Sequence, residues 1–378
     1  MAVHLSAYIL DIAALLFLIG MLSTKAVSSL YSKKPFILGI IMAVFVILAE
    51  AGTVVAGSGG INLRTVNIFC NLVGFGLAPM IPLVITLIFQ GNILGKYKLM
   101  LIPTLINAAL TVLSPKFGLI FYVAANNSYS RGNYFFVFVM VYILNFLCLV
   151  VSTLKVSKKY NYPMEEKLLA LSILTIFGTS IQVIDPLSNS TWHCVTLSLL
   201  LYFLLLSEFD SSFDALTGLY NRAAFEKMKK QLAEAKAYSI IVLDINDFKD
   251  INDTFGHDYG DAVIKTVAEA IQKSFNNRYT CYRLGGDEFF VFGSETNKEI
   301  IETRLRTLTS RLEEMREQGK PLPTVSYGYS IYNGGEKPDF SRTFKEADNQ
   351  MYLYKKIHKA EPAQDNDINL QRRTSPLH

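Results

Sequence analysis

The stretch at 280–292, TCYRLGGDEFFVF, decides the fold of the C-terminal half of the chain. Two short apolar runs, 280–284 and 288–292, flank the turn residues Gly285, Gly286 and Asp287. Glycine tolerates the tight backbone of a hairpin turn, so the pattern predicts two antiparallel strands with an acid at the tip. A further buried strand is predicted at 238–245, YSIIVLDI, which is rich in β-branched residues and ends with the carboxylate of Asp244.

Helices and strands alternate on either side of these strands. Helical periodicity is found at 222–235, where Phe225, Met228 and Leu232 share one face. Further helices are predicted at 262–275, 298–317 and 342–357, and a further strand at 324–331. This alternating α/β pattern predicts a central sheet covered by helices.

Three acidic residues lie where the predicted strands end. Asp244 closes a central strand, which is where α/β folds place ligands, and Asp287 and Glu288 lie at the hairpin turn. If the hairpin neighbours that strand, these carboxylates converge. Oxygen ligands without His or Cys suit Mg²⁺, whose coordination shell is completed by substrate phosphates and water. The alternative is that these acids are simply solvated at the strand ends.

Five segments in order resemble the motifs of the GGDEF family of diguanylate cyclases. They are FDALTGLYNRAAF at 213–225, LDINDFKDINDTFGHDYGD at 243–261, RLGGDEFFVF at 283–292, PTVSYGYS at 323–330 and ADNQMYLYKK at 347–356. The resemblance covers roughly 208–360. It implies a mostly antiparallel central sheet covered by helices, related to the catalytic domains of nucleotidyl cyclases.

The resemblance assigns metal-binding and catalytic roles. Asp244 and the backbone carbonyl of Ile245 would coordinate Mg²⁺, with Mn²⁺ as an alternative. Asp287 would be a further metal ligand and the base that accepts the proton of the ribose 3′-hydroxyl. Glu288 would hold the second metal ion, and Lys249 would offset charge that develops on the phosphates.

The resemblance also assigns a GTP site. Backbone amides around Asp247 and Phe248 would cradle the terminal phosphates, and Lys355 and Lys359 would reach the triphosphate. An Asp acceptor beside an Asn amide suits the donors and the acceptor of guanine. The residues that would contact the nucleotide are Asn252, His257, Asp261, Phe248, Lys355 and Lys359.

The implied reaction joins two GTP molecules into cyclic di-GMP and releases two pyrophosphates. The 3′-hydroxyl of one GTP attacks the α-phosphate of the other, and such phosphoryl transfer depends on positioning and charge neutralisation. Each domain would hold one nucleotide, so two domains must meet face to face. The resemblance therefore implies a homodimer.

Several of these residues also have structural interpretations. Phe248, Ile251 and Phe255 would pack in a core, and His257 would be a loop histidine. Capping and turn roles are predicted for Asp214, Asn221 and Arg222, a salt bridge for Arg283 and a structural role for Asp348.

The sequence departs from the family at two places. Asn276 and Tyr279 replace the Arg and Asp of the product-inhibition site found in many members, so feedback through that site is expected to be absent. In the closing helix, Lys359 stands where the family usually has Arg and His358 where it has a small residue. Lysine offers a point charge in place of a bidentate fork, which would weaken triphosphate binding.

The apolar sequence of the N-terminal half predicts a bundle of membrane-spanning helices. About seven runs are long and apolar enough to be bilayer-spanning helices, near 5–23, 36–56, 66–89, 99–114, 134–154, 168–184 and 191–206. The fourth is the least well bounded, because the apolar stretch continues past Pro115 to Val123. The loops after the first, third and fifth runs carry most of the basic residues: Lys25, Lys33, Lys34, Lys96, Lys98, Lys155, Lys158, Lys159 and Lys167.

Basic loops stay in the cytoplasm, so this alternation predicts an external N-terminus and a cytoplasmic C-terminal domain in the inner membrane. The expected organisation is a sensor region at 1–206, a signalling linker at 207–213, the GGDEF domain at 214–360 and a polar, disordered tail at 361–378. Because the linker is short, movement of the last membrane helix would pass directly to the soluble domain.

Two other functions are consistent with parts of the sequence. The GGDEF segment could bind GTP and signal without catalysis, although its acidic and basic positions are intact. The membrane half could instead be a transporter that the soluble half regulates, with Pro79, Pro82 and Pro103 marking broken helices. A net charge of +4 with no basic stripe gives no reason to expect nucleic-acid binding.

Overall fold

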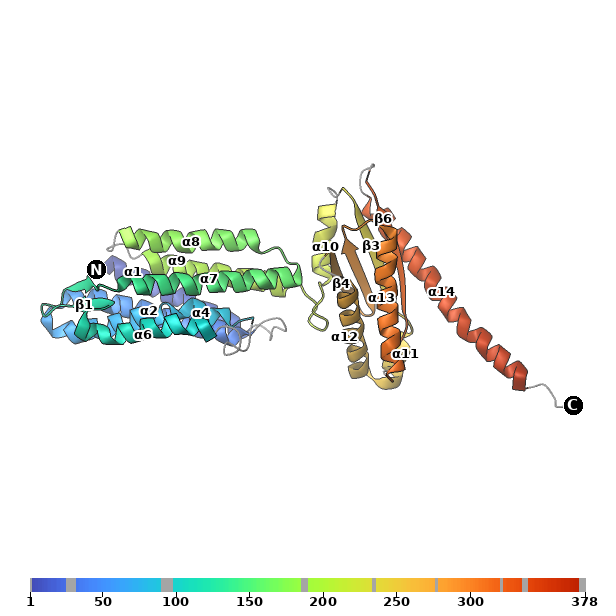
Figure 1. The fold of residues 1–378 in the computed structure, drawn as a ribbon, viewed down its shortest axis with the longest axis horizontal. Helices are drawn as coiled ribbons and strands as arrows, with labels where there is room; N and C mark the ends of the chain where they lie inside the picture. The colour runs from blue at the N-terminus through green and yellow to red at the C-terminus, as the bar shows by residue number, and fades with distance from the viewer. Residues whose placement is uncertain are drawn as a thin grey trace. The chain divides into compact units, whose positions relative to one another are not determined.

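The computed structural model describes residues 2–24, 32–89, 98–184, 190–232, 236–275, 278–319, 322–334 and 339–373. It divides into two units, Met1–Asp210 and Ser211–His378. The first unit is a bundle of helices and the second is a sheet with helices packed on it (Figure 1). Lys25, Lys96 and Asn276, on which sequence predictions rest, lie outside the described residues.

The helices of the first unit follow the apolar runs of the sequence. They are α1 (Ala2–Thr24), α2 (Lys33–Ser58), α3 (Arg64–Leu77), α4 (Met80–Thr86), α6 (Lys98–Phe117), α7 (Phe135–Tyr160), α8 (Glu165–Ile184) and α9 (Ser190–Asp210), with a 3₁₀ turn at Ile61–Leu63. Within the described residues, five helical segments are long and apolar enough to cross a membrane: Leu5–Thr24, Lys33–Ser58, Ile61–Thr86, Phe135–Tyr160 and Thr191–Asp210. The unit therefore has the helices of a membrane anchor.

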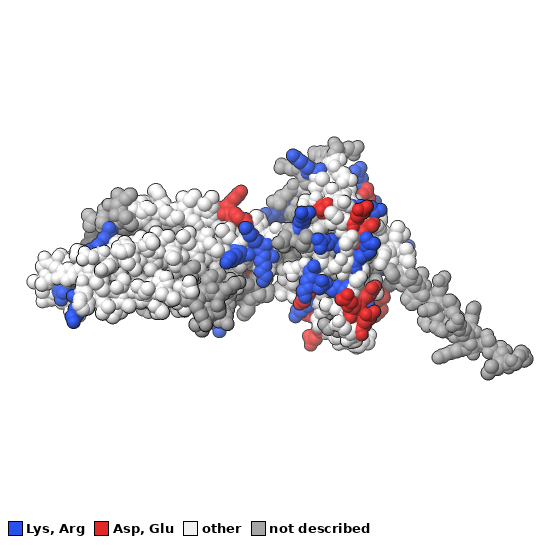
Figure 2. All heavy atoms as spheres, viewed as in Figure 1, with Lys and Arg blue, Asp and Glu red and all other residues white. Residues whose placement is uncertain are grey.

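Basic residues lie near the ends of these helices, whereas two acids, Asp11 in α1 and Glu50 in α2, lie inside them. Figure 2 shows Lys and Arg gathered near the ends of the first unit, whereas the middle of the drawn face carries none. Lys158 and Lys159 lie in the last turn of α7, and Glu165 and Glu166 lie in the first turn of α8. A middle band without Lys or Arg on the drawn face, between basic ends, is the distribution that a bilayer selects.

Helices α3 and α4 are separated by a break at Pro79. Proline has no N–H, so it cannot bond the Phe75 carbonyl four residues earlier. The side-chain amide of Asn107 donates to that carbonyl at 3.0 Å, and the amide of Asn145 donates to the Pro79 carbonyl at 2.8 Å. Of the three prolines proposed to mark broken helices, Pro82 and Pro103 lie inside α4 and α6.

The apolar stretch after α6 does not continue the helix. Helix α6 ends at Phe117, and Gly118 has a φ of 63°. Strands β1 (Phe121–Val123) and β2 (Tyr129–Arg131) then form an antiparallel hairpin. Arg64 donates to the carbonyls of Val123 and Ala124, both at 2.9 Å, so the hairpin is fixed to the start of α3. The apolar stretch to Val123, which left the end of the fourth run poorly bounded, is thus divided between the last turn of α6 and this hairpin.

The second unit contains a four-stranded sheet in the order β4-β5-β3-β6. The strands are β3 (Tyr238–Ile245), β4 (Tyr279–Gly285), β5 (Glu288–Gly293) and β6 (Val325–Tyr332). Every neighbouring pair is antiparallel. The predicted antiparallel central sheet is therefore confirmed, with the predicted hairpin next to the predicted central strand.

Side chains of β3 alternate between two hydrophobic cores. Successive strand residues point to opposite faces. Ile241, Leu243 and Ile245 pack with α12 (His257–Ser274) and α13 (Lys298–Glu317). Tyr238, Ile240 and Val242 pack with α10 (Arg222–Gln231) and α14 (Phe340–Arg373). Helices on both faces explain why β3 is almost continuously apolar.

Helix α14 lies against the backbone of β6. A Cβ atom at Gly328 would lie 2.1 Å from the Ala347 carbonyl oxygen and 2.4 Å from the Met351 amide nitrogen. The absence of a side chain at Gly328 therefore permits this close approach. The helix also continues through 361–373, a polar segment for which the sequence favours disorder.

The polar segment between β3 and residue 262 is largely helical, so helical structure begins well before the helix predicted at 262–275. Helix α11 spans Phe248–Phe255, and α12 begins at His257. Gly256 separates them with a φ of 84°. Phe248, Ile251 and Tyr259 give the two helices an apolar face against the core, a signal that the many Asp and Asn residues obscure.

Candidate active site

The candidate site lies where β3 ends beside the first residue of β5. Asp244 is the register partner of Glu288, and the Ile245 amide donates to the Asp287 carbonyl at 3.3 Å. On its other edge, Asp244 is the partner of Ser326 in β6. The pairing therefore brings together the acidic residues that the sequence places at separate strand ends.

The turn between β4 and β5 requires its two glycines. Gly285 has a φ of 155° and Gly286 a φ of 49°, both unfavourable for residues with a side chain. Arg283 donates to the Gly286 carbonyl from Nε at 3.0 Å and from Nη2 at 2.9 Å. These bonds hold the turn in the conformation that presents Asp287.

The same guanidinium ties the turn to the beginning of the unit. Nη1 of Arg283 lies 3.0 Å from Oδ1 of Asp214, which also accepts bonds from the Thr217 amide and hydroxyl. Burial alone would raise the pKa of Asp214, but the bonds from Thr217 and Arg283 outweigh it and lower that pKa below its usual value. The predicted turn role of Asp214 and salt bridge of Arg283 agree with this geometry.

The acidic cluster is electrostatically unfavourable without a cation. Burial raises the pKa of Glu288, and the charges of Asp244, Asp287 and Asp348 raise it further, while Arg222 opposes the shift. Like charges at this separation disfavour ionisation of one another. A cation placed among these carboxylates would remove that penalty.

One cation at the cluster comes from α14. The Lys355 ammonium contacts Oδ1 of Asp244, and both side chains are largely buried. Asp348 lies seven residues earlier on the same helix, so two helical turns place both residues on one face. The side chains of His358 and Lys359 lie outside the described residues.

The segment after β3 is anchored by Asn246, whose side chain is buried. Its backbone amide donates to the Thr324 carbonyl at 2.9 Å, and its side-chain oxygen accepts from the Ser326 hydroxyl at 2.8 Å. Asp247 follows with a φ of 52°, a left-handed conformation that is uncommon for a residue with a side chain. Helix α11 begins directly after this turn, and backbone amides at a helix start can bind anions.

The predicted guanine-binding residues lie on α11 and α12. A Cβ atom at Gly260 would lie 2.0 Å from Oδ1 of Asn252, so the Asn252 side chain rests on the start of α12. His257 and Asp261, one helical turn apart there, are exposed, as is Lys249 on α11. Phe248 and Ile251 pack against the core, as their structural interpretation predicts. The same prediction is wrong for Phe255, whose side chain is exposed at the end of α11.

The carboxylates do not form a complete metal site by themselves. Among the described residues, no group of three or more His, Cys, Asp or Glu side chains is arranged to hold a metal ion. The donors at the cluster are nevertheless all oxygen atoms, and Mg²⁺ normally takes only one or two carboxylates together with phosphates and water. The residues therefore fit a magnesium ion that arrives with a phosphorylated substrate.

Asp348 and Arg222 belong to the surroundings of the cluster but were assigned only structural roles from the sequence. Both influence the charge of Glu288. Asp348 and Lys355 are seven residues apart and share one helix face. This spacing is a signal in the sequence that both side chains lie near the same acidic cluster. No comparable pattern identifies Arg222, because α10 is distant in sequence from the acidic residues and only the tertiary fold relates them.

Comparisons with known proteins agree on the second unit. The family model described as diguanylate cyclase, GGDEF domain, matches residues 211–361. The chain is 29% identical over 153 residues to the diguanylate cyclase VdcA of Vibrio cholerae, which covers 39% of this chain and 45% of that protein. It is 30% identical over 159 residues to the diguanylate cyclase DosC of Escherichia coli, which covers 40% of this chain and 34% of that protein.

The chain thus spans less than half the length of these curated relatives. Among solved structures, the crystal structure of the GGDEF domain of DgcB from Caulobacter crescentus in complex with c-di-GMP is 30% identical. The match covers 39% of this chain and 91% of that chain, with a TM-score of 0.35.

Arg283→Ala should loosen the hairpin turn and lower the thermal unfolding midpoint of the second unit, because two bonds to Gly286 and the bond to Asp214 are lost. Asp214→Asn removes only the charge pair and should leave the turn ordered. Hydrogen exchange of the Gly286 and Asp287 amides in the full-length protein separates the two effects. Lys273→Ala, which removes an exposed pair with Glu269, is the control. Equal exchange in Arg283→Ala and wild type would contradict the assigned role.

Proposed function

Residues 211–361 are a GGDEF domain, and from this premise we propose that the protein is a membrane-anchored diguanylate cyclase that condenses two GTP molecules into cyclic di-GMP and two pyrophosphates. The observation that carries the proposal is the β3–β5 register, in which Asp244 faces Glu288 and the Asp287 backbone bonds to Ile245. This is the point at which acidic side chains from two motifs meet.

In this proposal the acidic cluster binds metal and activates the nucleophile. Asp244, the Ile245 carbonyl, Asp287 and Glu288 would hold two magnesium ions, with manganese as an alternative. When bound, these ions would neutralise charge on the attacking and leaving oxygens. Asp287 accepts the proton of the ribose 3′-hydroxyl from the tip of a turn that Arg283 fixes.

The phosphates would lie between α11 and α14. The amides at Asp247 and Phe248 are at a helix start, where they bind anionic oxygens. Lys249 and Lys355 supply positive charge, and Lys355 is already within reach of Asp244. Lys359 would extend this charge along α14. Negative charge that increases during transfer is thereby stabilised by groups already in place.

Guanine would bind beside the α11–α12 junction. Asn252 and Asp261 supply an amide and a carboxylate to the base edge, with His257 on the same exposed helix start. Because each domain binds one GTP and the reaction needs two, the active form is a homodimer in which two such sites face each other.

Asp287→Ala should abolish synthesis while preserving the fold, because the substituted side chain lies on a turn and not in the core. We expect a loss of at least about 100-fold in turnover, the usual scale for removing a general base. Purified full-length protein with GTP and Mg²⁺ is assayed for cyclic di-GMP and pyrophosphate. Glu269→Ala, an exposed acid on α12, should retain wild-type turnover.

The same assay tests the catalytically inactive alternative. Wild-type protein that dimerises and binds GTP but releases no pyrophosphate would favour a GTP-binding signalling module. Ion or solute flux through liposomes containing the protein would favour the transporter alternative.

We also propose that the N-terminus is external and the GGDEF domain cytoplasmic, because the basic loops alternate and GTP is available inside the cell. Green fluorescent protein fused after His378 should fluoresce, and alkaline phosphatase fused at the same residue should be inactive. Phosphatase fused after Asn133, in a loop predicted to be external, should be active. An active phosphatase at His378 would invert the topology and exclude the proposed activity.

A further inference from the structure

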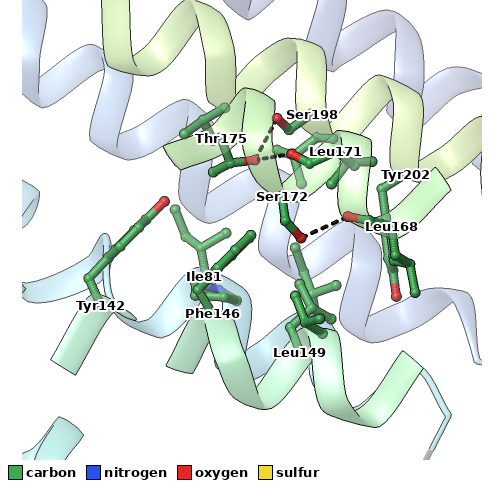
Figure 3. Close-up of a pocket in the computed structure, with 15 residues that line it drawn as sticks. Ile81, Tyr142, Phe146, Leu149, Leu168, Leu171, Ser172, Thr175, Ser198 and Tyr202 are labelled. Carbon is green, nitrogen blue, oxygen red and sulfur yellow. Dashed lines mark hydrogen bonds between the residues drawn. The ribbon is translucent and has the colours of Figure 1, made fainter. Parts of the chain in front are cut away.

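The membrane unit contains a cavity between helices α4, α7, α8 and α9 (Figure 3). Its volume is about 50 Å³. The walls are mainly aliphatic and aromatic, with contributions such as Ile85, Phe146, Leu171 and Leu199. A cavity with such a lining favours apolar occupants over water.

The cavity is elongated along the helices. Its lining runs along α7 from Tyr142 to Val150 and along α9 from Val195 to Tyr202. At 1.5 Å per residue, these stretches extend about 10–12 Å. Figure 3 places the two tyrosines at opposite ends. A narrow space of this length matches a single hydrocarbon chain better than a compact or ring-shaped molecule.

Most hydroxyl groups in the wall are already paired. Thr175 and Ser198 share a hydrogen bond of 2.8 Å, Ser172 donates to the Leu168 carbonyl at 2.7 Å, and Tyr202 bonds to Thr153 at 2.9 Å. The exception is Tyr142, whose hydroxyl has no hydrogen-bond partner among the described residues. The cavity therefore offers one polar contact at one end of an apolar channel.

We propose that this cavity binds a single-chain amphiphile, a hydrocarbon chain with one oxygen acceptor that meets the Tyr142 hydroxyl, and that its occupancy sets the activity of the protein. The first part is independent of the proposed function. The second part rests on it.

Helix α9 connects the cavity to the GGDEF domain, and this connection supports the proposed control of activity. Val195, Ser198, Leu199 and Tyr202 form one face of α9 on the cavity, at the spacing of neighbouring helical turns. The bonds Thr175–Ser198 and Thr153–Tyr202 connect that face to α8 and α7. Helix α9 ends at Asp210, and the GGDEF domain begins at the next residue. An occupant that shifts α9 therefore acts on the helix that leads into the catalytic domain.

Occupancy is tested by photolabelling the full-length protein in phosphatidylcholine nanodiscs with decanoic acid that carries a diazirine on its chain. Label should concentrate on cavity residues such as Phe146 and Leu171, and unlabelled decanoic acid should compete. Tyr142→Phe should weaken binding roughly three- to tenfold, the usual effect of losing one hydrogen bond. Ser172→Leu, which fills the cavity, should reduce labelling at least fivefold.

Ile173→Phe is the matched control, because it adds volume to α8 at an exposed side chain, and it should label as wild type does. Val195→Phe fills the cavity from α9 and provides a second test if Ser172→Leu fails to fold. Equal labelling of Ile173 and the cavity residues, or wild-type labelling in both filled variants, would overturn the site. So would equal cavity labelling by a phosphatidylcholine that carries the same diazirine chain, since the occupant would then be bulk lipid.

Coupling is tested with the same variants by measuring cyclic di-GMP synthesis with and without decanoic acid. We expect synthesis to change at least threefold in wild type and to become insensitive in Ser172→Leu. Insertion of four Gly/Ser residues between Asp210 and Ser211 should remove the response but leave labelling intact. Labelling with unchanged synthesis in active wild-type protein would overturn the regulatory role, whereas absence of all synthesis would instead overturn the proposed activity.

Discussion

Packing of like charges at the shared end of β3 and β5 is the constraint on which the second unit depends. The antiparallel register places Asp244 opposite Glu288, so their repulsion is built into the backbone. Burial and neighbouring acids raise the pKa of Glu288, and Lys355 offsets part of the charge from α14. The protein maintains this unfavourable cluster because two apolar cores, one on each face of β3, hold the strands in register.

Much of the second unit could be predicted from sequence because its strands are short, apolar and bounded by turn residues. The predicted strand at 238–245 and helix at 298–317 coincide with β3 and α13. The hairpin could be predicted from Gly285 and Gly286, because few other residues adopt the backbone angles of this turn. Helix α11 was missed because polar residues outnumber Phe248 and Ile251, and only packing on the core reveals their shared face.

The candidate site was less predictable than the fold because its contacts join distant segments. Neither the pairing of Lys355 with Asp244 nor the influence of Arg222 on Glu288 has a local sequence signal. In the membrane unit, hydropathy indicated the apolar segments but not the hairpin of β1 and β2. Only tertiary contacts, such as those of Arg64 with Val123 and Ala124, distinguish that hairpin from a continued helix.

The backbone contact at Gly328 also affects charge compensation further along the same face of α14. With no side chain between them, the strand and the helix touch directly near Ala347, and this sets the depth at which α14 lies. Lys355 lies two helical turns further along α14. The distance between α14 and β6 therefore determines whether its ammonium can reach Asp244. A methyl group at Gly328 would push α14 away from β6 and would withdraw the positive charge of Lys355 from the acidic cluster.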